Sequence, residues 1–158
     1  MRKIVLLIAL CAMILMTGYA QEPSKVEIKV NELVKRYENT KGVECLTVGK
    51  GSGLGMLKVM FNQQFGKDFM KGVTSITIVN YGDASQEVGL ELRKEVDALG
   101  SMLEEFKMGE GTNNPESYYI KSFASTSADK TISDFITIME NKDLKMIMYM
   151  AGKIKVED

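Results

Sequence analysis

The sequence has no histidine and no tryptophan, and it has only two cysteines and two prolines among its 158 residues. Without imidazole, the chain cannot build a Ser-His-Asp or Cys-His catalytic group, a histidine-ligated metal site or a histidine-based pH switch. Two cysteines are too few for a cysteine-rich zinc site or an iron–sulfur cluster. Lys and Arg total 20 against 21 for Asp and Glu, so there is no basic excess to indicate nucleic-acid binding.

The first 20 residues have the pattern of a Sec signal peptide. A basic pair, Arg2 and Lys3, precedes an unbroken apolar run at 4–16, and the segment ends in small residues at Gly18 and Ala20. An apolar run of this length is too short to span a bilayer as a helix. We therefore expect cleavage after Ala20, export to the periplasm or the extracellular space, and no remaining membrane span. The mature chain, 21–158, is expected to form a single domain.

Cleavage changes the cysteine and charge inventory. Cys11 follows Leu10, where a lipoprotein signal has a small residue, and the apolar run continues beyond it, so we do not expect lipidation. Cys45 then becomes the only thiol, which leaves no internal disulfide and makes the fold depend on its apolar core. Loss of Arg2 and Lys3 takes the formal net charge from −1 to −3.

The first half of the mature chain carries helical patterns. Apolar residues recur at helical spacing at 26–37, 54–65 and 88–99. The first helix is expected to end near Gly42 and the third at Gly100, with Asp83 and Gln86 as a capping pair before the third. Three helices are therefore predicted before residue 101.

Strand patterns lie between these helices and dominate the second half. Segments 43–49 and 73–81 are predicted strands, which we expect to run parallel because a helix separates them. Four further runs predict an antiparallel meander, at 102–108, 117–124, 131–139 and 144–151. The expected fold is α+β, a mixed sheet with helices packed on one face, helices mainly in the first half and the meander in the second.

The order of these motifs resembles a known protein family. The segments that carry the resemblance are 42–48 (GVECLTV), 76–81 (ITIVNY), 104–106 (EEF), 129–135 (DKTISDF) and a final hydrophobic strand ending in Gly152. Together they look like the exported Bacteroidota family catalogued as domain of unknown function 4252, over nearly the whole mature chain. The resemblance implies a small periplasmic or surface protein, encoded near extracytoplasmic sigma factors and their membrane-bound regulators. It carries over no catalytic or binding residue.

A glycine-rich segment after the first predicted strand departs from that family pattern. Its glycines are Gly49, Gly51, Gly53 and Gly55. Backbone N–H groups of such a segment can hold a phosphate at a helix N-terminus, but the spacing fits neither G-x-G-x-x-G nor a P-loop. We expect a flexible turn here. The alternative is a small-ligand or anion-binding module, with Lys50 and Lys58 as its cationic partners.

The final predicted strand also departs from the family pattern because it is rich in methionine. Met146, Met148 and Met150 alternate with other residues, so their thioethers lie on one face of a strand. Soft sulfur ligands suit Cu(I), but we expect these residues to fill the core. Whether they bind Cu(I) is left open by the sequence.

The paired carboxylates are expected to be structural. Glu104 and Glu105 are adjacent, so in a strand they point to opposite sides and cannot act together on one substrate. Asp129 and Asp134 stand at a hairpin entry, where solvated turn and edge positions are usual.

The sequence also contains a lone cysteine in a predicted strand and a pair of adjacent tyrosines. Cys45 lies in an alternating strand and is expected to be a buried, inert thiol. The adjacent Tyr118 and Tyr119 place one ring on each face of a strand, one in the core and one available to a partner. No catalytic residue, metal ligand or cofactor is assigned.

The expected function is therefore that of an exported, non-enzymatic domain. It is expected to act through contact with another protein of the cell envelope, in a stress or signalling circuit. The alternative is ligand or anion binding at Gly49 to Gly55. An enzyme comes third, because it would need a convergent Lys, Ser and carboxylate set that sequence spacing does not show.

Overall fold

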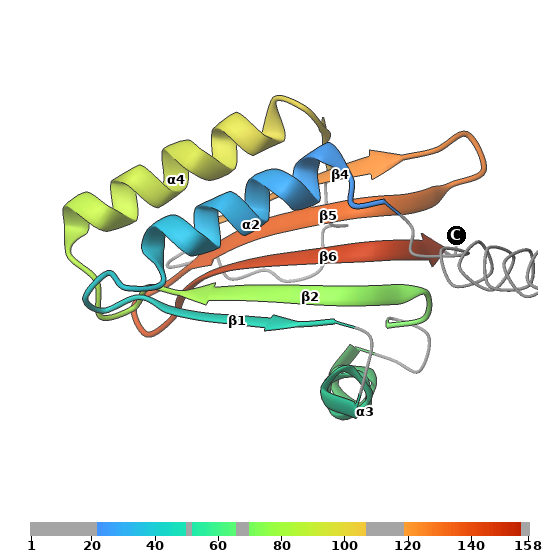
Figure 1. The fold of residues 1–158 in the computed structure, drawn as a ribbon, viewed down its shortest axis with the longest axis horizontal. Coiled ribbons are helices and arrows are strands. Elements are labelled where there is room, and N and C mark those ends of the chain that lie inside the picture. Colours follow the sequence, from blue (N-terminus) through green and yellow to red (C-terminus); the bar gives the residue numbers. More distant parts are fainter. Residues whose placement is uncertain (1–21, 50–51, 66–69, 107–118, 156–158) are drawn as a thin grey trace, which may run out of the picture.

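The computed structural model describes residues 22–49, 52–65, 70–106 and 119–155. Its elements in chain order are α2 (Lys25–Tyr37), β1 (Glu44–Val48), α3 (Ser52–Phe65), β2 (Val73–Asn80), α4 (Gln86–Gly100), β3 (Glu104–Glu105), β4 (Tyr119–Thr126), β5 (Thr131–Glu140) and β6 (Lys145–Lys155). The helices lie mostly in the first half and the strands mostly in the second, which confirms the predicted α+β class (Figure 1).

The six strands form one sheet in the order β1-β2-β6-β5-β4-β3, and every neighbouring pair is antiparallel. The prediction that β1 and β2 run parallel is wrong, since Glu44 lies opposite Asn80 and Val48 opposite Ile76. Figure 1 shows the reason, because α3 is seen end-on while the strands run across the picture. The helix does not carry the chain back along the sheet, so β2 starts from the end at which β1 stops.

Helices α2 and α4 lie side by side on one face of the sheet (Figure 1). Each begins at a serine, since the hydroxyl groups of Ser24 and Ser85 accept hydrogen bonds from N–H groups in the first turn. Ser85 is thus the N-cap of α4, in place of the predicted pair formed by Asp83 and Gln86. No helix of the described residues is long and apolar enough to cross a membrane.

Helix α3 lies on the other face. Tyr149 packs in the core under α2 and α4, whereas its neighbour Met150 packs in a second core with Leu54 of α3. Neighbouring residues of a strand point to opposite faces, so the two cores lie on opposite sides of the sheet. The expectation of helices on one face therefore holds for α2 and α4 and not for α3.

Two irregularities in the pairing shape one end of the sheet. The register of β2 on β6 shifts between Val73 and Ser75, and the register of β5 on β6 shifts between Ile132 and Asp134. The first shift lies opposite Ala151 and Gly152 of β6, and the second spans Ala151 to Ile154 of the same strand. Bulges of this kind turn side chains away from their regular positions and are common beside functional sites.

Candidate functional site

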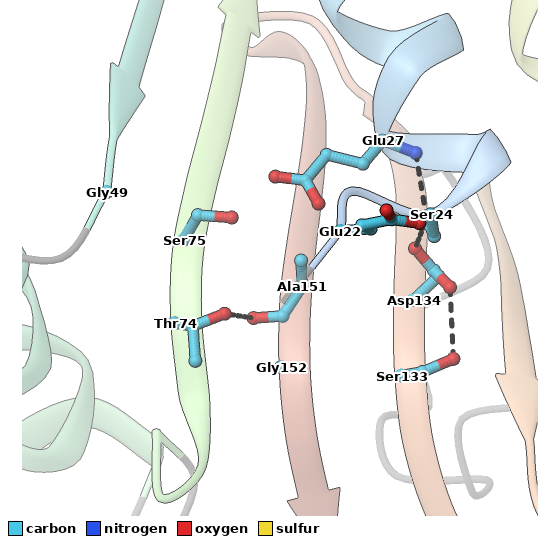
Figure 2. Close-up of a pocket in the computed structure, with 10 residues that line it drawn as sticks. All are labelled: Glu22, Ser24, Glu27, Gly49, Thr74, Ser75, Ser133, Asp134, Ala151 and Gly152. Carbon is cyan, nitrogen blue, oxygen red and sulfur yellow. Dashed lines mark hydrogen bonds between the residues drawn. The ribbon is translucent and has the colours of Figure 1, made fainter. Parts of the chain in front are cut away.

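A groove of about 610 Å³ lies at this end of the sheet (Figure 2). Its walls come from the start of α2, the residue after β1, and strands β2, β5 and β6. Polar residues at both register shifts line it, and the Thr74 hydroxyl donates a hydrogen bond to the Ala151 carbonyl. The lining residues are Glu22, Ser24, Glu27, Gly49, Thr74, Ser75, Ser133, Asp134, Ala151 and Gly152.

Asp134 is the central polar group of this groove. It is only 4% exposed, and its Oδ1 accepts hydrogen bonds from the Ser24 hydroxyl at 2.5 Å and the Tyr149 hydroxyl at 2.7 Å. Its Oδ2 accepts a bond from Ser133 at 3.0 Å. Burial, with the bond to Asp134 second, raises the pKa of Tyr149, so this hydroxyl keeps its proton as a donor. The carboxylate thus joins the start of α2 to β5 and β6.

The sequence-based placement of Asp134 at a solvated turn position is therefore wrong. Ile136 and Ile138 lie two and four residues further along β5 and pack under α2 and α4. Alternation along the strand places Asp134 on that same covered face. The even spacing of Asp134 from these isoleucines was the sequence signal that could have identified it as a buried carboxylate. Asp129, the other member of the pair, is exposed and accepts a bond from Ser127.

The groove is acidic. Glu22 and Glu27 join Asp134 among its lining residues, and none of the described lining residues is a lysine or an arginine. Carboxylates attract ligands that are positively charged or that donate hydrogen bonds, and they repel anions. Within the described ranges, however, no group of three or more His, Cys, Asp or Glu side chains is arranged to hold a metal ion.

The glycine-rich segment only partly forms the expected turn. Gly49 directly follows β1 and lines the groove, but Gly53 and Gly55 lie inside α3. Leu54 is buried in the second core, and this packing offsets the cost of glycine in a helix. Lys58 lies on α3 and does not line the groove, whereas Lys50 and Gly51 fall outside the described residues. The turn prediction is thus wrong for the second half of the segment.

The three methionines of the final strand lie on the face of the sheet that α3 covers. Met148 and Met150 are buried in the second core, and Met146 is half-buried. Packing with apolar neighbours such as Ile76 agrees with the expected role as core residues. Binding of Cu(I) by this set was the alternative to that role, and it stays untested.

A second buried carboxylate, Glu140, is paired with a cation. It accepts a hydrogen bond from the Tyr81 hydroxyl at 2.5 Å and two bonds from the Arg93 guanidinium, one of them at 2.9 Å from Nε. Burial alone would raise the pKa of Glu140, but the bonds from Arg93 and Tyr81 outweigh it and lower that pKa. Arg93 also lies over the Tyr119 ring. This cluster fastens α4 to the sheet through a satisfied ion pair.

The remaining predicted residues lie apart from the groove. Glu104 and Glu105 form the short edge strand β3, and both are exposed. Cys45 is half-buried on β1, and burial raises the pKa of its thiol, which makes it less reactive at neutral pH. Tyr119 is exposed, as expected of one ring of the pair, and Tyr118 lies outside the described residues.

Compared with known proteins, the chain matches no protein-family model, and no curated protein or solved structure shows significant similarity to it.

Proposed function

We propose that this chain is an exported, non-enzymatic domain that acts through contact with another protein of the cell envelope. The signal-peptide pattern of residues 1–20 supports export. The motif order of the mature chain, which resembles the exported Bacteroidota family described above, supports a place in envelope stress or signalling.

The observation that carries the proposal is the surface of α3. This helix has a single charged residue, Lys58. Met56 is 72% exposed and Val59 is 59% exposed, and residues three apart lie on the same face of a helix. Neighbouring exposed apolar side chains of this kind are typical of surfaces that contact another protein. Covering each of these side chains would contribute about 1–2 kcal/mol to binding.

Site-specific crosslinking in intact cells tests this surface. A photoreactive residue in place of Val59 is expected to form an adduct with another envelope protein. The same residue in place of Leu90, an apolar residue of α4 that is 49% exposed, is the matched control and is expected to form none. Met56→Asp is expected to abolish the adduct. The proposal fails if position 59 forms no adduct, or forms the same one as position 90.

A second candidate function is supported by the groove. Three carboxylates together with Gly49 favour a small ligand that is positively charged or rich in hydrogen-bond donors, rather than the anion expected from the glycine-rich segment. The candidate ligand is therefore a cation or a hydrogen-bond donor, not the anion expected from the sequence. Gly49, at one end of the glycine-rich segment, is the part of that segment that lines the groove.

Thermal unfolding in the presence of ligands tests the groove. A polyamine such as spermidine is expected to raise the Tm in proportion to its binding, and inorganic phosphate is expected to leave it unchanged. Glu27→Gln should weaken the polyamine effect, whereas Glu104→Gln, on the distant strand β3, should not. Equal shifts in both variants would mean that the polyamine binds by general charge alone.

A further inference from the structure

The two edges of the sheet are built differently. At one edge, β3 has only two residues and both are glutamates, and Lys121 lies on the neighbouring strand β4. Short length and charge are the usual means by which proteins protect an edge from pairing with another strand. At the other edge, β1 has five residues, contains no lysine, arginine or proline, and pairs with β2 without a register shift.

The residues of β1 itself therefore carry none of these protective features. On its outer side it pairs with no other strand of the described residues. An antiparallel strand is bonded to one neighbour by alternate residues, so the remaining N–H and C=O groups of β1 point outward. The chemistry that fits this row of donors and acceptors is another extended strand.

We propose that this strand is β1 of a second copy of the chain, so that two copies join their sheets edge to edge across a twofold axis. Full overlap of the five residues in antiparallel orientation fixes the register. It places Leu46 opposite Leu46 of the second copy, Glu44 opposite Val48, and Cys45 opposite Thr47. The only charged residue of the strand thus faces an apolar residue, so no like charges oppose each other. A single patch that complements itself is what a twofold dimer requires.

The position of Leu46 supports this pairing. Its side chain is 50% exposed. Leu46 lies on the same face of the strand as Val48, which packs against the second core. Opposed residues of an antiparallel pair have their Cβ atoms about 4.5–5.5 Å apart, so the two leucines would cover each other. Helix α3 packs on the face opposite α2 and α4, and the twofold axis is perpendicular to the sheet, so both copies of α3 would lie on one face of the joined sheet.

The mass of the purified mature protein in solution is the first test, measured by light scattering after size exclusion. We expect twice the mass of one chain. Leu46→Asp places two carboxylates opposite each other at the axis and is expected to weaken association at least tenfold, giving a monomer. Ile120→Asp on β4 is the matched control, because Ile120 is 51% exposed, and this variant should stay dimeric. A monomeric wild-type protein overturns the proposal, as does a dimer that Leu46→Asp leaves intact.

Disulfide trapping tests the register. With Cys45 replaced by Ser, a Leu46→Cys variant has its new thiol opposite that of the second copy and is expected to form a covalent dimer under mild oxidation. A Glu44→Cys variant in the same background is the control, because its thiol lies roughly 13 Å along the strand from its counterpart. Crosslinking of Glu44→Cys without crosslinking of Leu46→Cys contradicts the proposed register. These tests need only this protein, so they are independent of contact with an envelope partner.

Discussion

Tyr149→Phe removes one of the three hydroxyl groups that solvate the buried carboxylate of Asp134. The ring of Tyr149 is buried in the core under α2 and α4, and phenylalanine keeps that ring, so no cavity forms. What is lost is the 2.7 Å hydrogen bond to Oδ1. A hydrogen bond to a charged group contributes about 1.5–3 kcal/mol, and we expect the free energy of unfolding to fall by that amount. For a domain of this size the Tm should fall by roughly 5–10 °C.

Urea denaturation followed by circular dichroism measures the change. The midpoint is expected to fall while the slope m stays constant, because the fold and the buried surface are unchanged. Tyr119→Phe, on an exposed ring, is the control and should change the stability by less than about 0.5 kcal/mol. In a double-mutant cycle, Tyr149→Phe and Asp134→Asn should couple by at least about 1 kcal/mol. Additive effects, or a loss below about 0.5 kcal/mol for Tyr149→Phe, would show that the bond does not stabilise the fold.

Three further predictions follow from other parts of the molecule. Because the pKa of Glu140 is lowered in the folded state, its contribution is present above the usual pKa of about 4.5 and is lost as the pH falls. The stability advantage of the wild type over Glu140→Gln should therefore shrink between pH 6 and pH 3, and a constant difference would contradict this. Gly72→Ala should lower stability by about 2 kcal/mol or more, because φ is +84° and a Cβ would lie 1.9 Å from the Lys153 carbonyl oxygen. Gly49→Ala, with open space around it, should cost less, and equal losses would count against the steric cause. If the proposed signal is cleaved, amino-terminal sequencing of the protein recovered from its cells should begin at Gln21, and an uncleaved chain would contradict export by a cleaved signal.

The helices of the described chain were predictable because their signals are local. In α2 and α4, apolar residues recur every three or four positions, and this spacing alone determines which side faces the sheet. The helical period from Leu54 likewise located α3, although glycines stand on both sides of that residue. Local composition suggested a turn at Gly53 and Gly55. These residues are helical instead because burial of Leu54 in the second core stabilises the helix.

The direction of β2 and the role of Asp134 depend on contacts between distant residues. A helix between two strands implies parallel pairing only when it runs back along the sheet, and no residue of α3 specifies its angle to the strands. Two of the three partners of Asp134 come from the start of α2 and from β6, and Ser24 is 110 positions away in sequence. Alternation could place this carboxylate on the covered face, but it could not supply the hydroxyl groups around it.

Strand β6 is the last described strand of the chain, yet it lies between β2 and β5 in the middle of the sheet. The β1-β2 pair and the β3-β4-β5 group have no direct pairing with each other, so only β6 joins them. During synthesis the chain emerges in sequence order, and the residues of both groups are made before the strand that connects them. Until β6 inserts, β2 and β5 each present an open edge, and the closure must bring together residues far apart in sequence, which slows folding. A chain of this design stays incompletely folded until residues 145–155 have been made, and that delay would suit the export proposed above, in which the chain crosses the membrane before it folds.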